Sequence, residues 1–186
     1  MINIINKIIF LRILRWKIKG TIPDDKKIIA IVAPHTSAYD FIIALIARSV
    51  LKMEKRIKFL GKAELFKNRI FGFILRKLGG YSVDRSKNNN MVDAVVDIFN
   101  SKTEFFITIG PEGTRKKVNK LKTGFYYIAL KARVPILMIG LDFKKKMIQI
   151  SELFNVSGNI KEDMKFILNF FKPFDGKIPE NGLKHI

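Results

Sequence analysis

The sequence contains no cysteine, which excludes disulfide bonds, thiolate metal sites and a cysteine nucleophile. It also lacks a long uncharged stretch. The longest one, Ile28 to Tyr39, contains Pro34 and falls well short of the roughly 20 apolar residues that a membrane-spanning helix needs. We therefore expect no segment that crosses a bilayer. Cations are interleaved with the apolar residues of the N-terminus, so the basic-then-apolar order of a signal peptide is missing too.

Acidic residues are few relative to basic ones. The chain has 35 Lys and Arg against 16 Asp and Glu, a net charge of +19. Such an excess concentrates polyanions around a protein, and both nucleic acid and anionic lipid are polyanionic. The basic residues are spread along the whole chain, without an RNA-binding aromatic signature, zinc-finger spacing or a clear helix-turn-helix pattern. We therefore expect an anionic membrane surface as the partner, rather than nucleic acid.

The chain has 186 residues, of which 48% are hydrophobic, and this fits one compact domain. Short β-branched runs such as Ile28–Val32 and Phe105–Ile109 alternate with long helical patterns. This alternation predicts a single α/β domain with a mostly parallel central sheet flanked by helices.

An amphipathic helix is predicted over residues 2–19, where cations are mixed with isoleucine, leucine and Trp16. We assign residues 1–20 to an N-terminal interfacial helix and residues 21–186 to the domain that carries the site. An ordinary packing helix is the alternative.

Nine further elements follow from the periodicity. The predicted strands are Ile57–Leu60, Gly80–Val83, Ile136–Leu141 and Met147–Ile150, and the predicted helices are Phe41–Leu51, Leu65–Leu78, Met91–Ser101, Thr123–Arg133 and Lys161–Phe171. The segment Leu65–Leu78 is rich in aromatic and basic residues. We expect it to pack on the core, with lipid contact as the alternative.

Only two histidines are present, and one of them, His185, is the penultimate residue. His35 is therefore the candidate for imidazole chemistry. Asp40 follows it across a predicted strand-to-helix corner, the place where open α/β sheets bind ligands. There the carboxylate can orient the ring as a general base. In the alternative interpretation, Ser37 and Asp40 form a helix-capping box and Asp40 serves only structure.

Two further motifs follow predicted strands. Residues 110–115, Gly-Pro-Glu-Gly-Thr-Arg, place backbone N–H groups and a guanidinium where an anion such as phosphate can bind. The alternative is a turn with a solvated basic tail.

Residues 79–85 end in Asp84 and Arg85, and Arg85 is a candidate for a second phosphate contact. Its alternative is a surface ion pair, worth about 0–1 kcal/mol.

Together, these motifs resemble the blocks of the glycerolipid acyltransferase family in order and approximate spacing. His35 and Asp40 match the His-x4-Asp block, residues 80–85 resemble the second block, and residues 111–115 match the Pro-Glu-Gly-Thr-Arg block. Residues 134–135, Val-Pro, are similar to the short fourth block. The sequence departs from the family at residue 110, where a glycine replaces the usual bulky residue, and at residue 116, where a lysine replaces a small hydroxyl residue.

The resemblance implies an acyltransferase in phospholipid biosynthesis. Its substrates would be acyl-CoA or acyl-carrier protein as donor and a lysolipid as acceptor, with 1-acyl-glycerol-3-phosphate, which gives phosphatidate, as the first expectation. We expect no tightly bound cofactor and no metal. We also expect a peripheral or monotopic attachment to the cytoplasmic face of the cell membrane.

The resemblance also implies the role of each site residue. His35 would take the proton from the acceptor hydroxyl, and Asp40 would orient the ring. The remaining block residues are expected to form the acceptor site, with Glu112 positioning the acceptor or bracing Arg115 and with Gly113 and Thr114 forming the turn: Arg85, Glu112, Gly113, Thr114 and Arg115.

Three alternatives stay open. The acceptor could be a lyso-aminolipid without phosphate. A lipid hydrolase is suggested by residues 80–84, Gly-Tyr-Ser-Val-Asp, but the final glycine of a nucleophile elbow is missing. The third alternative is a non-catalytic module that binds lipid or nucleic acid through its positive field.

Overall fold

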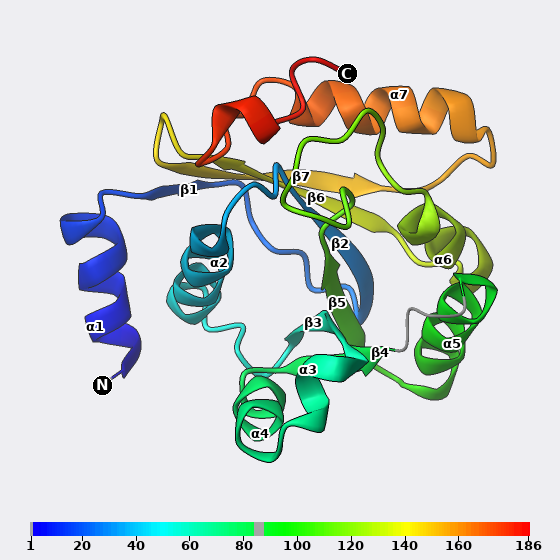
Figure 1. The fold of residues 1–186 in the computed structure, drawn as a ribbon, viewed down its shortest axis with the longest axis horizontal. Helices are drawn as coiled ribbons and strands as arrows, with labels where there is room; N and C mark the ends of the chain where they lie inside the picture. The colour runs from blue at the N-terminus through cyan, green and yellow to red at the C-terminus, as the bar shows by residue number, and fades with distance from the viewer. Residues whose placement is uncertain (1, 84–87) are drawn as a thin grey trace.

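The computed structural model describes residues 2–83 and 88–186. These residues form a seven-stranded sheet in the order β1-β7-β6-β2-β5-β3-β4 (Figure 1). The strands are β1 (Lys17–Lys19), β2 (Lys27–Ala33), β3 (Ile57–Lys62), β4 (Gly80–Val83), β5 (Phe105–Ile109), β6 (Ile136–Asp142) and β7 (Met147–Phe154). All neighbouring strands are parallel except β6 and β7, which are antiparallel. The predicted α/β fold with a mostly parallel sheet is confirmed.

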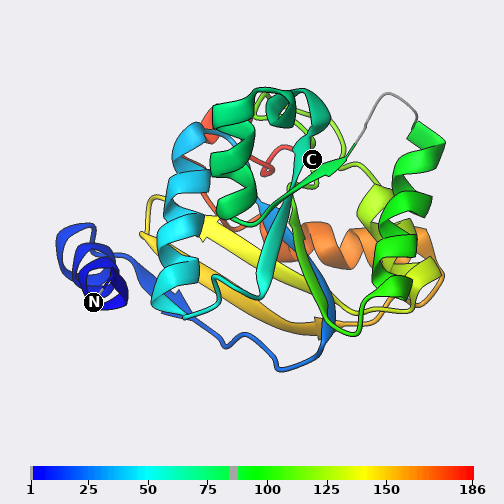
Figure 2. The same ribbon diagram turned by 90° about the horizontal axis from the view of Figure 1, so that it is seen from below.

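Helices cover both faces of this sheet (Figures 1 and 2). The α-helices are α1 (Ile2–Ile8), α2 (Ala38–Val50), α3 (Ala63–Lys67), α4 (Arg69–Lys77), α5 (Asn88–Ser101), α6 (Gly124–Ala132) and α7 (Ile160–Phe171), with a π-helical turn η1 (Ile9–Ile13) and a 3-10 turn η2 (Pro179–Asn181). The helices α5, α6 and α7 pack on one face, and α2 with η1 packs on the other.

The central strand β2 shows why the sequence folds this way. Its residues 28–31 are four consecutive apolar residues, and all of them are fully buried. Strands of a parallel sheet are covered on both faces, so such a run predicts a central parallel strand. β2 pairs with β5 on one side and with β6 on the other. As a result, the corner that follows β2 lies at the middle of the sheet edge.

The N-terminal helix is shorter than predicted. Helix α1 continues into η1 and ends there, and Arg15 has a φ of 57°, in the left-handed region. Trp16 then turns into the core, where its ring lies 6.2 Å from that of Phe10 and 5.0 Å from that of Phe143. Residues 17–19 form β1 beside β7. The prediction of a helix to residue 19 is therefore wrong, because burial of Trp16 and strand pairing end the helix.

The predicted helix Leu65–Leu78 is two helices. Asn68 separates α3 from α4, and its side chain accepts hydrogen bonds from the backbone N–H groups of Ile70 (3.1 Å) and Phe71 (2.9 Å). Such a cap starts a new helix. Core packing holds for Phe66 and Leu75, which are buried. It fails for the outward side of α4, where several apolar residues are exposed.

Within residues 2–83 and 88–186, no helix has the length and apolar character that a membrane crossing requires.

Candidate active site

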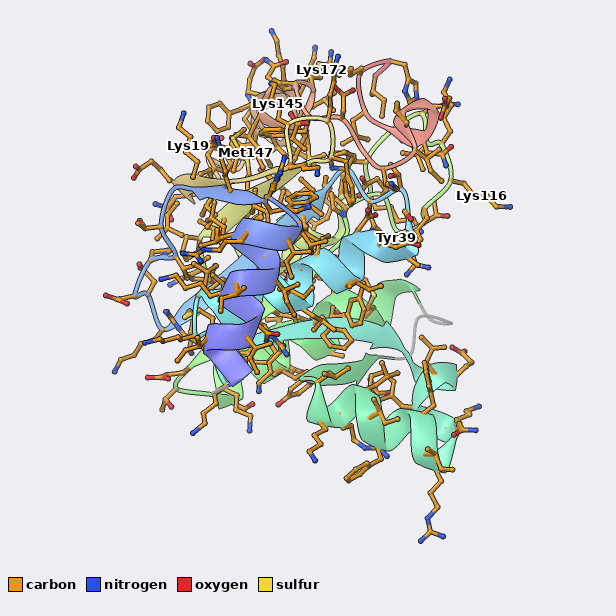
Figure 3. The ribbon with its side chains drawn as sticks, turned by 90° about the vertical axis from the view of Figure 1, so that its left-hand side faces the viewer. Lys19, Tyr39, Lys116, Lys145, Met147 and Lys172 are labelled. Atoms are coloured by element: carbon orange, nitrogen blue, oxygen red, sulfur yellow. The ribbon has the colours of Figure 1, made fainter. Side chains whose placement is uncertain are left out.

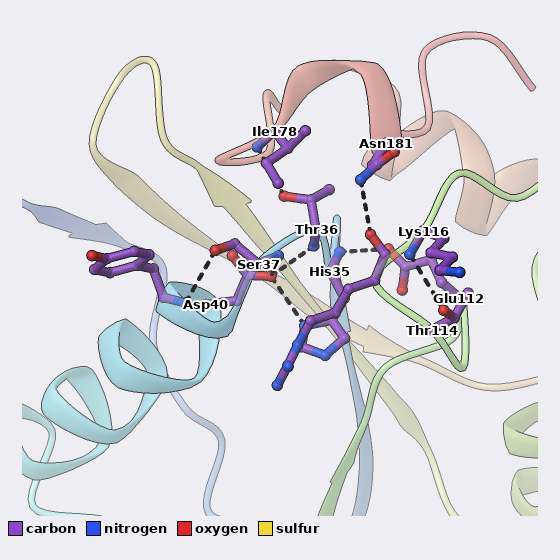
Figure 4. Close-up of polar contacts among 11 residues, drawn as sticks. His35, Thr36, Ser37, Asp40, Glu112, Thr114, Lys116, Ile178 and Asn181 are labelled. Carbon is purple, nitrogen blue, oxygen red and sulfur yellow. Dashed lines mark hydrogen bonds and ion pairs between the residues drawn. The ribbon is translucent and has the colours of Figure 1, made fainter.

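The site forms where β2 and β5 end side by side. In this parallel pair Ile31 is opposite Ile109, so the chain leaves both strands at the same edge of the sheet. The corner after β2 carries His35, and the turn after β5 begins at Gly110. Figure 4 shows these two segments next to each other. This is the edge at which open α/β sheets bind ligands.

The structure brings His35 and Asp40 together. The Nδ1 atom of His35 lies 3.1 Å from Oδ2 of Asp40, and the two side chains are 29% and 2% exposed, respectively. A buried carboxylate at Nδ1 fixes the orientation of the ring and leaves Nε2 to accept a proton. The pair thus has the geometry of a general base and its orienting acid.

Asp40 also caps helix α2, so the predicted capping box is present together with the His35 contact. The same Oδ2 atom accepts hydrogen bonds from the backbone N–H groups of Thr36 (2.7 Å) and Ser37 (2.8 Å). The Ser37 hydroxyl accepts a hydrogen bond from the Tyr39 N–H at 3.3 Å. Ser37 and Asp40 also form the reciprocal capping box, in which each side chain accepts from the backbone N–H of the other residue. The helix cap therefore holds the carboxylate in place for His35.

Glu112 contacts the histidine corner. Its Oε1 accepts a hydrogen bond of 2.6 Å from the backbone N–H of His35, and its side chain is 1% exposed. Its Oε2 is buried and has no hydrogen-bond partner among the described residues. Burial raises the pKa of Glu112 to about 7, against the opposing effect of the His35 hydrogen bond. The structure thus links the Pro-Glu-Gly-Thr-Arg turn to the backbone of His35.

The turn itself is built by the residues after Glu112. Gly113 has a φ of 69°, in the left-handed region that favours glycine. The Gly113 N–H donates to the Gly110 carbonyl at 3.1 Å, and the Thr114 hydroxyl accepts from the Lys116 N–H at 3.3 Å. Gly113 and Thr114 thus shape the turn in this structure.

Of the two arginines expected to contact phosphate, the structure describes only Arg115. Arg115 is exposed and lines the pocket into which His35 opens, and its carbonyl accepts a hydrogen bond from the side chain of Asn181 at 3.1 Å. Arg85, the other expected phosphate contact, lies outside the described residues.

The pocket beside His35 has a volume of about 460 Å³. Its polar end contains His35, Asp40 and Arg115. Most of the remaining lining is apolar: Val32, Phe41, Ala44, Phe59, Leu60, Leu65, Phe71, Leu75, Ile109 and Leu141. A smaller cavity of about 100 Å³ shares six lining residues with this pocket and extends to Ile148 and Ile150. A hydrocarbon chain can therefore lie along apolar walls while a polar group stays at His35.

The ring of His35 rests against a residue without a side chain. A Cβ added to Gly110 would lie 3.4 Å from Cδ2 of His35, at ordinary contact distance. A bulky residue, which the resembled family often has here, would therefore contact the ring and take up space in the pocket.

The C-terminal segment also supports the site, which the sequence did not indicate. The Ile178 N–H donates to the Thr36 hydroxyl at 3.2 Å, and a Cβ added to Gly176 would lie 2.6 Å from Cγ2 of Thr36. Thr36 is almost completely buried beneath this segment. A contact between residues 142 positions apart leaves no local pattern in a single sequence.

Within the part of the chain that the structure describes, no group of three or more His, Asp or Glu side chains is arranged to hold a metal ion.

Comparison with known proteins shows the family to which the chain is related. The family model described as "Acyltransferase" matches residues 14–142. A 1-acyl-sn-glycerol-3-phosphate acyltransferase from Streptococcus pneumoniae is 31% identical over 137 residues, which cover 68% of this chain and 49% of the relative. The chain thus spans about half the length of this curated relative.

A solved structure supports the fold. The crystal structure of PlsC from Thermotoga maritima, a 1-acyl-sn-glycerophosphate (LPA) acyltransferase, aligns with a TM-score of 0.61 over 99% of this chain and 77% of that chain, at 20% identity. At this identity the likeness concerns the fold. The family model covers well over half of the chain and includes the His35 corner and the Gly110 turn, so the chain belongs to the glycerolipid acyltransferase family.

Proposed function

We propose that the protein transfers a fatty acyl group from acyl-CoA or acyl-carrier protein to the hydroxyl of a lysolipid, with 1-acyl-glycerol-3-phosphate as acceptor and phosphatidate as product. The observation that carries this proposal is the His35–Asp40 pair at the polar end of a pocket with mainly apolar walls. The S. pneumoniae relative is a 1-acyl-sn-glycerol-3-phosphate acyltransferase, which supports this choice of acceptor. Phospholipid biosynthesis at the cytoplasmic face of the cell membrane is part of the same proposal.

The chemical step needs one base and no acyl-enzyme. Nε2 of His35 takes the proton of the acceptor hydroxyl while the oxygen attacks the thioester carbonyl carbon. The tetrahedral intermediate then collapses, the carbon–sulfur bond breaks, and the imidazolium returns the proton to the thiolate. Asp40, held by the cap of α2, keeps the ring oriented and stabilises the imidazolium.

The two ends of the pocket suit the two parts of a lysophosphatidate. Arg115 lies at the polar end, and its planar guanidinium can bind phosphate through two parallel hydrogen bonds. The apolar walls can cover an acyl chain, and each buried methylene contributes about 0.8 kcal/mol. A hydrolase built on Ser82 is disfavoured, because Ser82 belongs to β4 and does not line this pocket.

The first helix supports attachment to a membrane. Ile4 and Ile13 are each 66% exposed, and Lys7 and Arg12 are on the same short segment. We retain an interfacial role for this exposed face of residues 1–20.

Steady-state kinetics with two acceptors test this proposal. Arg115→Lys keeps the charge but loses the bidentate geometry, so we expect the KM for lysophosphatidate to rise about tenfold or more. The KM for the thioester should stay within twofold of wild type. With a lyso-aminolipid that has no phosphate, the wild type should be a poor enzyme and the substitution should change little. An equal loss on both acceptors would contradict a phosphate site at Arg115, and release of free fatty acid without acceptor would indicate a hydrolase.

A further inference from the structure

Helices α3 and α4 present an exposed apolar face. Ile70 is 76% exposed, Phe73 61% and Ile74 46%, and Leu65 on α3 is 46% exposed. Positions 70, 73 and 74 are three and four residues apart, so they lie on one side of α4. In Figure 1 and Figure 3, this helix is at the end of the molecule away from α7. A grouped set of large exposed apolar residues indicates a surface that binds a partner.

The outward orientation of this face is fixed by the opposite side of α4. Gly72 and Leu75 are buried there. A Cβ added to Gly72 would lie 2.9 Å from the backbone carbonyl carbon of Phe66, so α4 is packed directly against α3. The helix cannot rotate to hide Ile70 and Phe73 without breaking this contact. Their exposure is therefore a property of the packing.

Cations surround the apolar face. Lys67, Arg69, Arg76 and Lys77 are all exposed on these two helices, whereas Glu64 is the single acid in residues 63–78. The ammonium group of Lys77 lies 5.9 Å from the centre of the Phe73 ring. A short helix with exposed isoleucine and phenylalanine and long basic side chains at its edges fits the interface of an anionic bilayer. There the rings enter the acyl boundary and the cations reach lipid phosphates.

The same two helices form a wall of the pocket. Leu65, Phe71 and Leu75 line the space that leads to His35. Leu65 and Phe71 are also partly exposed at the surface, so the outer face and the pocket wall are continuous. A lysolipid held in a bilayer against α4 would therefore lie next to the pocket, and its acyl chain could enter without crossing water.

We propose that the outward face of α3 and α4 is a membrane-docking surface, which seats in the interface of an anionic bilayer and gives the pocket access to lipid. This inference rests on the proposed function for the lipid nature of the acceptor. The surface is separate from the N-terminal helix, which packs on α2. Residues of α3 and α4 line the pocket, whereas none of α1 does.

Vesicle binding and activity in two media test the surface. The variant carries Ile70→Ser and Phe73→Ser, neither of which lines the pocket. The matched control is Leu130→Ser, an exposed leucine of α6 on the other side of the sheet. The full-length proteins are sedimented with phosphatidylcholine vesicles containing phosphatidylglycerol. Acyl transfer is then measured with lysophosphatidate either embedded in these vesicles or dispersed in detergent micelles.

We expect each lost side chain to weaken vesicle binding about tenfold, because burying an apolar residue of this size contributes about 1.5 kcal/mol or more. Transfer to the embedded acceptor should fall with binding, whereas transfer in micelles should stay within twofold of wild type. Leu130→Ser should behave as wild type in both media.

Unchanged vesicle binding by the double variant would overturn the proposal. The proposal would also fail if the double variant bound vesicles normally but lost acyl transfer only with acyl-carrier protein as donor. The face would then bind that acidic carrier. If the wild type transferred no acyl group in either medium, the proposed function would fail, while the vesicle measurement would still decide whether α3 and α4 bind lipid.

Discussion

A single carboxylate oxygen of Asp40 serves both a helix and a histidine. Oδ2 accepts from the backbone N–H groups of Thr36 and Ser37 and lies beside Nδ1 of His35. A change at Asp40 alone therefore alters stability and catalysis together. Ser37 provides a matched control, because its hydroxyl caps the same helix through Tyr39.

We expect Asp40→Asn to lower kcat by about 10²–10⁴, because an amide cannot stabilise an imidazolium as a carboxylate does. Ser37→Ala should cost about 1 kcal/mol of stability with kcat within twofold of wild type. Turnover at saturating substrate and urea unfolding of both variants give the comparison. If Asp40→Asn lost stability but kept wild-type turnover, Asp40 would be a helix cap only.

Glu112 gives the folded protein a carboxyl group that titrates near neutral pH. Its pKa is raised by burial from 4.5 to about 7, so the folded state keeps a proton that the unfolded chain has lost in this range. The stabilisation from this group is complete below about pH 4.5 and is lost as the pH rises to about 7, by on the order of 3 kcal/mol.

A glutamine at this position stays neutral and keeps an oxygen for the His35 N–H. From about pH 5 to about pH 8, we therefore expect the free energy of unfolding of wild type to fall relative to that of Glu112→Gln. Urea unfolding of both proteins at the two pH values measures this. A difference that is the same at both pH values would mean that Glu112 ionises at its ordinary pKa.

The sequence supports His35 and Asp40 as partners because they flank one corner and are five positions apart. It does not predict the contact between Glu112 and the His35 backbone, because the two residues follow different strands and are 77 positions apart. The role expected for Glu112 at an arginine came from the resemblance, and no hydrogen bond or ion pair between Glu112 and Arg115 is present among the described residues.

At the scale of elements, the central strands β2, β5 and β6 were predictable because they contain buried runs of apolar residues, whereas β1 was predicted as the end of the first helix. The helices near the surface were less predictable. The end of the first helix depends on Trp16, whose pocket is formed in part by Phe143 from the β6–β7 turn. The break at Asn68 depends on a cap that a continuous apolar pattern hides. The first boundary thus depends on a contact distant in sequence, and the second on a local side-chain cap.

The segment after α7 is tied to the site by close contact at a glycine. A Cβ at Gly176 would lie 2.6 Å from Cγ2 and 2.7 Å from Oγ1 of Thr36, whose N–H donates to Asp40. We expect Gly176→Ala to cost about 1–3 kcal/mol in stability, as overpacking does. It should also lower kcat.

Gly124→Ala is the control for this change, because its Cβ would lie 3.6 Å from Cε of Met91, an ordinary contact. Thermal unfolding and turnover of the two variants are compared. Wild-type stability and turnover in Gly176→Ala would show that the C-terminal segment does not hold Thr36.

At the scale of the whole molecule, the net charge of +19 is distributed over several faces. Figure 3 shows Lys19, Lys116, Lys145 and Lys172, from separate parts of the chain, at different sides of the molecule and apart from α4. A field of this extent would attract an anionic surface from any direction, and in our proposal the apolar faces of α1 and α4 then decide which side inserts.

Vesicle binding should therefore depend on salt and on lipid charge. Raising the salt to about 1 M shortens the Debye length from about 10 Å to about 3 Å, so binding to anionic vesicles should weaken and neutral vesicles should bind poorly. Ile4→Ser with Ile13→Ser tests the first helix, since deletion of residues 1–19 would also remove the buried Phe10 and Trp16. Sedimentation that is insensitive to salt and lipid charge would contradict an electrostatic role in membrane binding.

The general-base role of His35 is tested most directly by acyl transfer in His35→Ala. Labelled thioester and lysophosphatidate are supplied at saturating concentration, and the formation of labelled phosphatidate is followed alongside urea unfolding. We expect turnover to fall by at least about 10²–10⁴, with little change in the free energy of unfolding, because the ring lies 29% exposed at the pocket. Turnover within a few fold of wild type in a folded variant would contradict catalysis by the His35–Asp40 pair.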